Sequence, residues 1–145
     1  MFQTFDESYF SPVITQGVNP VTYTDRIFKG YRSGNFVNIE FRALITSATA
    51  VGGILITVPT SLPIAQSSFW NEGTYGGPVV GTVIFSDIAT GTWYSGVARS
   101  EAAGLTVFGV VSGTAVTMGG AAPVVGLAVG DQLGYHLSYI TSAVL

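Results

Sequence analysis

The chain has few side chains that could catalyse a reaction, and its single histidine is the first of them. His136 follows Asp131 by five residues, and serines occur throughout the sequence. A Ser–His–acid triad is recognised by the geometry of its three side chains and not by their positions in the sequence. A lone histidine in a strand is more commonly a structural or surface residue. We therefore expect no catalytic residue.

Metal and carboxylate chemistry also find little support in the sequence. With one histidine, no cysteine and scattered acidic residues, the metal-binding side chains do not form a cluster. Two carboxylates could still meet in space and hydrolyse a glycoside, so a small carbohydrate-active enzyme stays open as an alternative. Glu40 is the only acid that we expect in mid-strand, where it shares a face with Arg42. We predict a protein without enzymatic activity, metal or cofactor.

A loop between Pro59 and Pro78 is the segment best suited to recognition. Its candidate contact residues are Phe69, Trp70, Glu72 and Tyr75. Loops on a rigid β-scaffold carry recognition, and exposed aromatic rings anchor many interfaces. The rings could equally cap one end of a hydrophobic core. If the loop is exposed, a sugar or a neighbouring subunit is its natural partner.

The first dozen residues form a distinct arm that is rich in aromatic rings. Its candidate assembly residues are Phe2, Phe5, Tyr9 and Phe10. These rings show no strand pattern and need a surface to cover them, on their own domain or on a neighbouring subunit. We expect residues 1–12 to form an extended N-terminal arm and residues 13–145 to form one domain.

The elements that must position these residues follow the period of β-strands. One apolar face is predicted from Val37, Ile39, Phe41, Ala43 and Ile45. A second is predicted from Leu133, Tyr135, Leu137, Tyr139 and Thr141, with His136, Ser138 and Ile140 on the opposite side. An apolar period of two is typical of half-buried strands, and glycine or proline turns separate many short runs of this kind. The sequence predicts an all-β, single-domain β-sandwich, and we expect the topology of a jelly roll.

Charge is scarce in this chain. Only 9% of the residues are charged and 48% are hydrophobic, whereas charged residues make up about 25% of typical soluble domains. Glycines and a proline interrupt the longest uncharged stretch, Gly104 to Gly130, so we expect no membrane-spanning helix. The net charge of -3 gives no general attraction to nucleic acid. From Ala102 to Leu145 the only formal charge is Asp131, and closed homo-oligomers bury surfaces of this kind.

The block from Tyr31 to Phe41, with the sequence YRSGNFVNIEF, resembles a pattern in virion proteins of tailed bacteriophages. The segments Val21–Thr24 and Leu137–Ile140 are similar to the usual flanks of that pattern. The resemblance implies a jelly-roll module that works as a trimer on a phage particle. Modules of this family occur as decoration or cement proteins of capsids and as receptor-binding heads of tail fibres. They carry no enzymatic residues, so the resemblance transfers none to this chain.

Together these observations predict a non-enzymatic structural protein of the virion, assembled in the host cytoplasm. We expect a homotrimer that stabilises the particle as a capsid decoration or cement subunit and contacts the major capsid protein or other virion proteins. The alternative is a tail-fibre or tail-tip protein that binds a glycan on the host surface. Neither function requires nucleic acid as a partner.

Overall fold

The computed structural model describes residues 2–48, 53–65, 79–101, 104–111, 114–117 and 126–143, and every regular element in them is a β-strand. In chain order the strands are β1 (Phe2–Phe5), β2 (Ile14–Gln16), β3 (Asn19–Ser33), β4 (Phe36–Ser47), β5 (Ile54–Ile56), β6 (Val79–Asp87), β7 (Thr92–Glu101), β8 (Gly104–Val111), β9 (Thr114–Thr117) and β10 (Gln132–Ile140). No helix long and apolar enough to cross a membrane occurs within these ranges. The predicted all-β, single-domain sandwich is confirmed.

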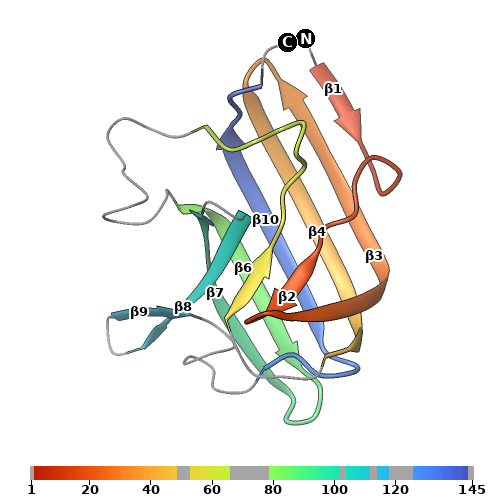
Figure 1. Ribbon diagram of the computed structural model, residues 1–145, viewed down its shortest axis with the longest axis vertical. Coiled ribbons are helices and arrows are strands. Elements are labelled where there is room, and N and C mark those ends of the chain that lie inside the picture. Colours follow the sequence, from red (N-terminus) through yellow and green to blue (C-terminus); the bar gives the residue numbers. More distant parts are fainter. Residues whose placement is uncertain are drawn as a thin grey trace.

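The strands form one antiparallel sheet that curls back on itself. Its order is β1-β3-β2-β5-β8-β7-β6-β10-β4, and β9 pairs with β8. The last strand of this order, β4, also pairs with the second strand, β3, so the sheet closes on itself. In Figure 1 the long strands β3, β4 and β10 lie side by side, and β2 lies in front of them. The jelly-roll topology stays a prediction.

The bend of β3 helps the sheet to curl. Its first residues pair with β2, and most of its remaining length pairs with β4. The pairing with β4 shifts register between Thr22 and Tyr23 and again between Thr24 and Ile27. Such bulges bend a strand and increase its twist. The start of β3 therefore sweeps away from the long layer and reaches β2 (Figure 1).

The hydrophobic core lies inside the curl, as the alternation in the sequence predicted. The predicted inward residues of β4 are at most 2% exposed, and those of the β10 segment at most 5%. His136, Ser138 and Ile140 lie on the outside, which confirms the predicted second face. Phe28, Phe41 and Phe85 are the largest fully buried side chains, and the ring of Phe41 stacks on Tyr135 at 5.0 Å. These two long strands thus present one face to the core and leave the other free.

Residues 2–5 of the N-terminal arm form a strand, which the sequence did not predict. β1 pairs antiparallel with the end of β3, from Phe2 opposite Ser33 to Phe5 opposite Gly30. The same residues of β3 pair with β4, so β1 adds to the other edge of β3. Four residues are too few to show a strand period, and their pairing depends on an edge that is distant in sequence.

Candidate functional site

The outer face of the sheet between β4 and β7 contains the candidate site. Glu40 and Arg42 of β4 alternate with its buried residues and therefore face outward. β10 runs beside β4, with Gly134 opposite Arg42 and His136 opposite Glu40. On the other edge of β10, Ile84 of β6 lies opposite Gly134. Three neighbouring strands therefore bring these side chains to one surface.

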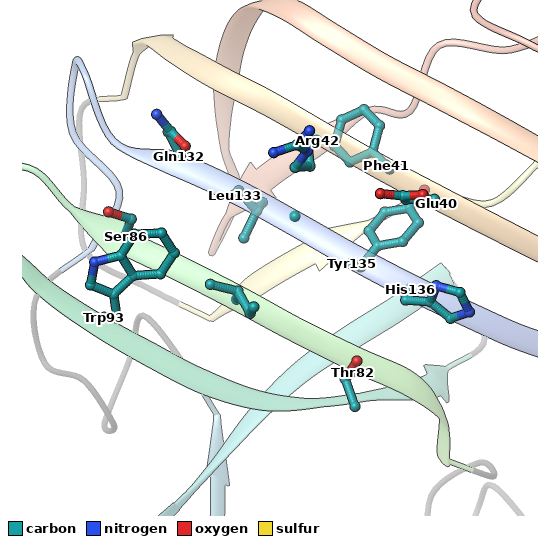
Figure 2. A pocket seen from close by; sticks show the side chains of 12 residues that line it. Glu40, Phe41, Arg42, Thr82, Ser86, Trp93, Gln132, Leu133, Tyr135 and His136 are labelled. Carbon is teal, nitrogen blue, oxygen red and sulfur yellow. The ribbon is translucent and has the colours of Figure 1, made fainter.

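A hollow in this surface includes Gly134, and because Gly134 has no side chain, the stem of Arg42 lies close over the middle of β10. A Cβ atom there would lie 3.0 Å from Cγ of Arg42 and 3.2 Å from the carbonyl oxygen of Phe41. The hollow is a groove with a volume of about 250 Å³. It is lined by Glu40, Phe41, Arg42, Thr82, Ile84, Ser86, Trp93, Gln132, Leu133, Gly134, Tyr135 and His136. We call it the sheet groove (Figure 2).

One end of the sheet groove is apolar. Trp93 of β7 lies opposite Ser86 of β6 and is 69% exposed, which is unusual for so large an apolar ring. Ile84, two residues before Ser86, is 48% exposed on the same face. Figure 2 shows the indole of Trp93 beside Ser86, away from Glu40 and His136. An exposed ring on a rigid strand offers a preformed stacking surface.

The other end of the sheet groove is polar. Asn38 donates its side-chain amide to Oγ of Ser138 at 2.9 Å, and the same nitrogen lies 3.3 Å from Nε2 of His136. Because an amide nitrogen only donates, Nε2 accepts this bond and the neutral ring carries its proton on Nδ1. Glu40 of β4 stands beside the histidine, and Arg42 lies one step further along β4, opposite Gly134 (Figure 2). This end therefore supplies both hydrogen-bond donors and acceptors.

The described lining of the sheet groove combines apolar and polar side chains. Of its described lining residues, Glu40 alone carries a carboxylate, whereas glycoside hydrolysis by the usual mechanism needs two. Within the described ranges, no three His, Cys, Asp or Glu side chains gather where they could hold a metal ion. What the groove offers is an exposed ring, an aliphatic side chain and several polar groups around a shallow floor.

The structure separates His136 from Asp131, the acid nearest to it in sequence. Asp131 is buried just before β10, where Oδ1 accepts the backbone N–H of Ile88 at 3.0 Å and Oδ2 accepts that of Ala128 at 2.8 Å. His136 lies on the outer face with Asn38 as its partner. Asp131 thus joins the β6–β7 turn to the loop that precedes β10, and it does not orient the histidine.

The four aromatic residues of the predicted arm gather over the end of β3. Phe5 is 9% exposed, stacks on Tyr9 at 5.0 Å and lies over Gly30, where a Cβ atom would overlap its ring. Phe10 packs against Phe28 with ring centroids 5.8 Å apart. The hydroxyl of Tyr9 lies 2.6 Å from that of Ser61. Three of the four rings thus pack on the arm's own domain.

Phe2 is the exception among the arm's rings. It is 65% exposed and touches the domain through a stack on Tyr31, with ring centroids 5.4 Å apart. The structure therefore anchors the arm mainly at Phe5 and leaves its first residues on the surface. The predicted role of the arm in assembly stays a prediction.

The predicted contact residues Phe69, Trp70, Glu72 and Tyr75 lie outside the described residues. Four of the five basic residues form a cluster in the sequence, and a solvated strand face is the more common interpretation of such a cluster: Arg26, Lys29, Arg32 and Arg42. The structure describes most of this basic cluster and separates its members. Arg42 faces the sheet groove, whereas Arg32 is buried, with Nε donating to the carbonyl of Gly34 and Nη2 to that of Ala143, both at 2.7 Å. The interpretation of this cluster as a solvated face is therefore wrong for Arg32, which holds the C-terminal segment against the β3–β4 turn.

Sequence reasoning missed the sheet groove because its residues come from β4, from the β6–β7 hairpin and from β10, three segments that are distant along the chain. Two local signals pointed towards it. Trp93 occurs in a run with strand character, and Gly134 interrupts the outward side of a strand that otherwise carries mostly polar groups. Only the pairing of β10 with both β4 and β6 brings these signals together.

Comparison of the chain with protein-family models, with curated proteins and with solved structures finds no match.

Proposed function

We propose that this protein is a non-enzymatic structural protein of a tailed-phage virion, a homotrimeric subunit that decorates or cements the capsid. The resemblance from Tyr31 to Phe41 supports the virion setting. The scarcity of charge after Ala102 supports contact with neighbouring chains. Its partners would be further copies of itself and the major capsid protein or another virion protein.

The observation that carries this proposal is the weak attachment of β1. The strand has four residues, and three of their side chains are exposed. Its one buried side chain, Phe5, sits over a glycine of β3. Short elements with few buried contacts open locally at small cost in free energy. β1 can therefore leave β3 without unfolding the rest of the sheet.

An arm that leaves its own β3 exposes a strand edge that an identical arm can occupy. Adding a strand to a free edge satisfies backbone N–H and C=O groups, and a second copy supplies the same Phe5 ring for Gly30. Exchange of an identical element between protomers is a low-cost route to closed oligomers. In a trimer, each arm would pair with β3 of the next subunit around the ring.

The opposite end of the molecule offers a second contact. Ile88 of the β6–β7 turn and Val129 of the loop before β10 are 63% and 67% exposed, and Asp131 holds the two segments together. In Figure 1 both segments lie at the lower end of the molecule, whereas the termini lie at the upper end. A subunit that uses its arm for its own copies would have this apolar end free for the capsid.

The oligomeric state tests the assembly part of the proposal. At micromolar concentration we expect a trimer by light scattering after size exclusion, and a shift towards monomer for Phe5→Ala, because this change removes the buried anchor of β1. Phe2→Ala is the matched control, since this ring is 65% exposed, and it should keep the trimer. A full-length chain that stays monomeric would contradict the proposal.

The virion part needs a separate measurement. Immunogold electron microscopy of particles produced by the genome that encodes this chain should place label on the capsid shell. Label on the tail alone would favour the second candidate, a tail-fibre or tail-tip receptor-binding protein. The exposed Trp93 in the sheet groove is the observation that favours this second candidate. Unlabelled particles would exclude both.

A further inference from the structure

We infer that the sheet groove binds a neutral saccharide, with Trp93 as the stacking platform and the β4–β10 end as the hydrogen-bonding end. This inference goes beyond assembly and supplies a ligand class for the receptor-binding candidate. It places recognition on a sheet face, whereas the sequence pointed to the loop around residues 69–75.

The dimensions of the groove suit a short oligosaccharide. The lining residues extend from β4 across β10 and β6 to β7, which is three strand spacings or about 14 Å. With a volume of about 250 Å³ the groove is smaller than the usual pockets for drug-sized ligands, which hold about 300–1,000 Å³. A shallow groove of this length would hold one or two sugar rings and leave the rest of a chain in solvent.

The apolar end matches the face of a sugar ring. Pyranose rings present C–H groups on one face and hydroxyls around the rim, so they pack on aromatic rings and still form hydrogen bonds at the edge. Trp93 exposes its indole next to Ser86, and Gln132 lies opposite Ser86 on β10. A sugar stacked on the indole would therefore find a hydroxyl and an amide at its rim.

The polar end matches pairs of neighbouring hydroxyls. The guanidinium of Arg42 presents a planar fork of donors, and the carboxylate of Glu40 presents two acceptors. Adjacent sugar hydroxyls can accept from the first and donate to the second. His136 adds an Nδ1 donor when it is neutral, because Nε2 accepts from Asn38.

The charges that line the sheet groove favour a neutral saccharide over the other classes of ligand. Arg42 and Glu40 cancel each other, so the described lining has no excess of positive charge to attract an acidic sugar. A nucleic acid backbone would need several cations, and the whole chain carries a net charge of -3. An apolar ligand would displace water from Arg42 and Glu40 and would not replace the hydrogen bonds that this water makes to their charged groups.

A glycan array that carries neutral and acidic oligosaccharides tests the inference with the full-length chain. We expect binding to neutral glycans, and a titration with the best soluble glycan should show little dependence on salt. Trp93→Ala should weaken this binding about thirtyfold, as expected when the anchor of a site is removed. Because Trp93 is 69% exposed, thermal unfolding of this variant should match that of the parent.

Val129→Ala is the control, since Val129 is exposed to a similar degree but lies outside the groove lining, and it should bind like the parent. Gly134→Ala tests the floor, because the added methyl group would crowd Arg42, and it should also weaken binding. An array without neutral hits, binding to acidic glycans alone, or unchanged binding by Trp93→Ala would overturn the inference. A monomeric chain that binds glycan would instead contradict only the assembly proposal.

Discussion

Two tyrosines of β10 occupy the same core face and differ in one hydrogen bond. The hydroxyl of Tyr139 donates to the carbonyl of Leu62 at 2.8 Å. The hydroxyl of Tyr135 is buried and has no hydrogen-bond partner in the part of the chain that the structure describes. An unsatisfied buried polar group costs free energy, whereas a satisfied one is close to neutral or favourable.

Removing each hydroxyl should therefore change stability in opposite directions. We expect Tyr135→Phe to raise the free energy of unfolding by about 1 kcal/mol, because the ring packing stays and an unpaired hydroxyl is lost. Tyr139→Phe should lower it by about 1 kcal/mol, because the carbonyl of Leu62 loses its donor. Urea unfolding of the two matched variants and the parent measures both values. Equal effects of the same sign would contradict this account of the β10 core.

The same tyrosines should make the protein less stable at alkaline pH. Burial raises the pKa of both side chains above the usual value, and for Tyr135 the neighbouring Tyr139 and Tyr23 add to the increase. The folded state therefore keeps both hydroxyls protonated where the unfolded state would ionise them. The protonated hydroxyls contribute their full stability below a pH of about 10, which is the pKa of tyrosine in the unfolded chain. This contribution is lost as the pH rises towards the higher pKa values of the folded state.

Urea unfolding as a function of pH measures this loss. Near pH 8 the two tyrosines should not change the free energy of unfolding with pH. Above about pH 10 they should make it fall. Tyr135→Phe should reduce the slope in the alkaline range, because one of the two shifted groups is gone. A slope that is the same in the parent and in Tyr135→Phe would exclude Tyr135 as a source of the effect.

At the scale of elements, Asp131 connects two segments that share no strand pairing with each other. It accepts backbone N–H groups from the β6–β7 turn and from its own loop, and the carbonyl of Asp131 accepts from Ile45 at 2.8 Å. We expect Asp131→Ala to lower the free energy of unfolding by about 1 kcal/mol, because it leaves two part-buried N–H groups without their acceptor. Chemical denaturation checks the value. Asp6→Ala is the control, since Asp6 caps an exposed turn, and a larger loss for this variant would contradict the account.

How far the sequence predicts these elements depends on whether the signal is local. The faces of β4 and β10 follow from alternation alone, so the core residues from Val37 to Ile45 could be predicted. β1 could not be predicted, because an edge of β3 rather than its own four residues determines its structure. Arg32 was predicted on the surface, since nothing local indicates that the carbonyls of Gly34 and Ala143 would receive its guanidinium.

The candidate site follows the same rule. Each outward residue of the sheet groove could be assigned to a face, but the register that brings Gly134 between Arg42 and Ile84 depends on pairings across long stretches of chain. The sequence instead favoured the aromatic loop around Trp70, where neighbouring residues share one segment. Sites made by one segment can be predicted from composition, whereas sites made by a sheet face need the topology.

At the scale of the whole molecule, the two ends and one face have separate roles in our account. The upper end in Figure 1 carries β1 and the termini, and the lower end carries the β6–β7 turn and the loop before β10, which contain the exposed Ile88 and Val129. The sheet groove lies on the outer face between β4 and β7. A subunit of this kind can contact its copies, a particle and a ligand at the same time. Exchange of β1 between copies is the central claim, because it converts a single sheet into an assembly.

A pair of engineered cysteines tests this exchange most directly, because the chain has no cysteine of its own. Phe2 and Ser33 are opposite each other in the β1–β3 pairing, where Cα atoms are about 4.5–5.5 Å apart and a disulfide can form. If arms are exchanged, Phe2→Cys combined with Ser33→Cys should give covalent dimers and trimers on non-reducing electrophoresis after oxidation. A product that is entirely monomeric, with its disulfide inside one chain, would contradict the claim.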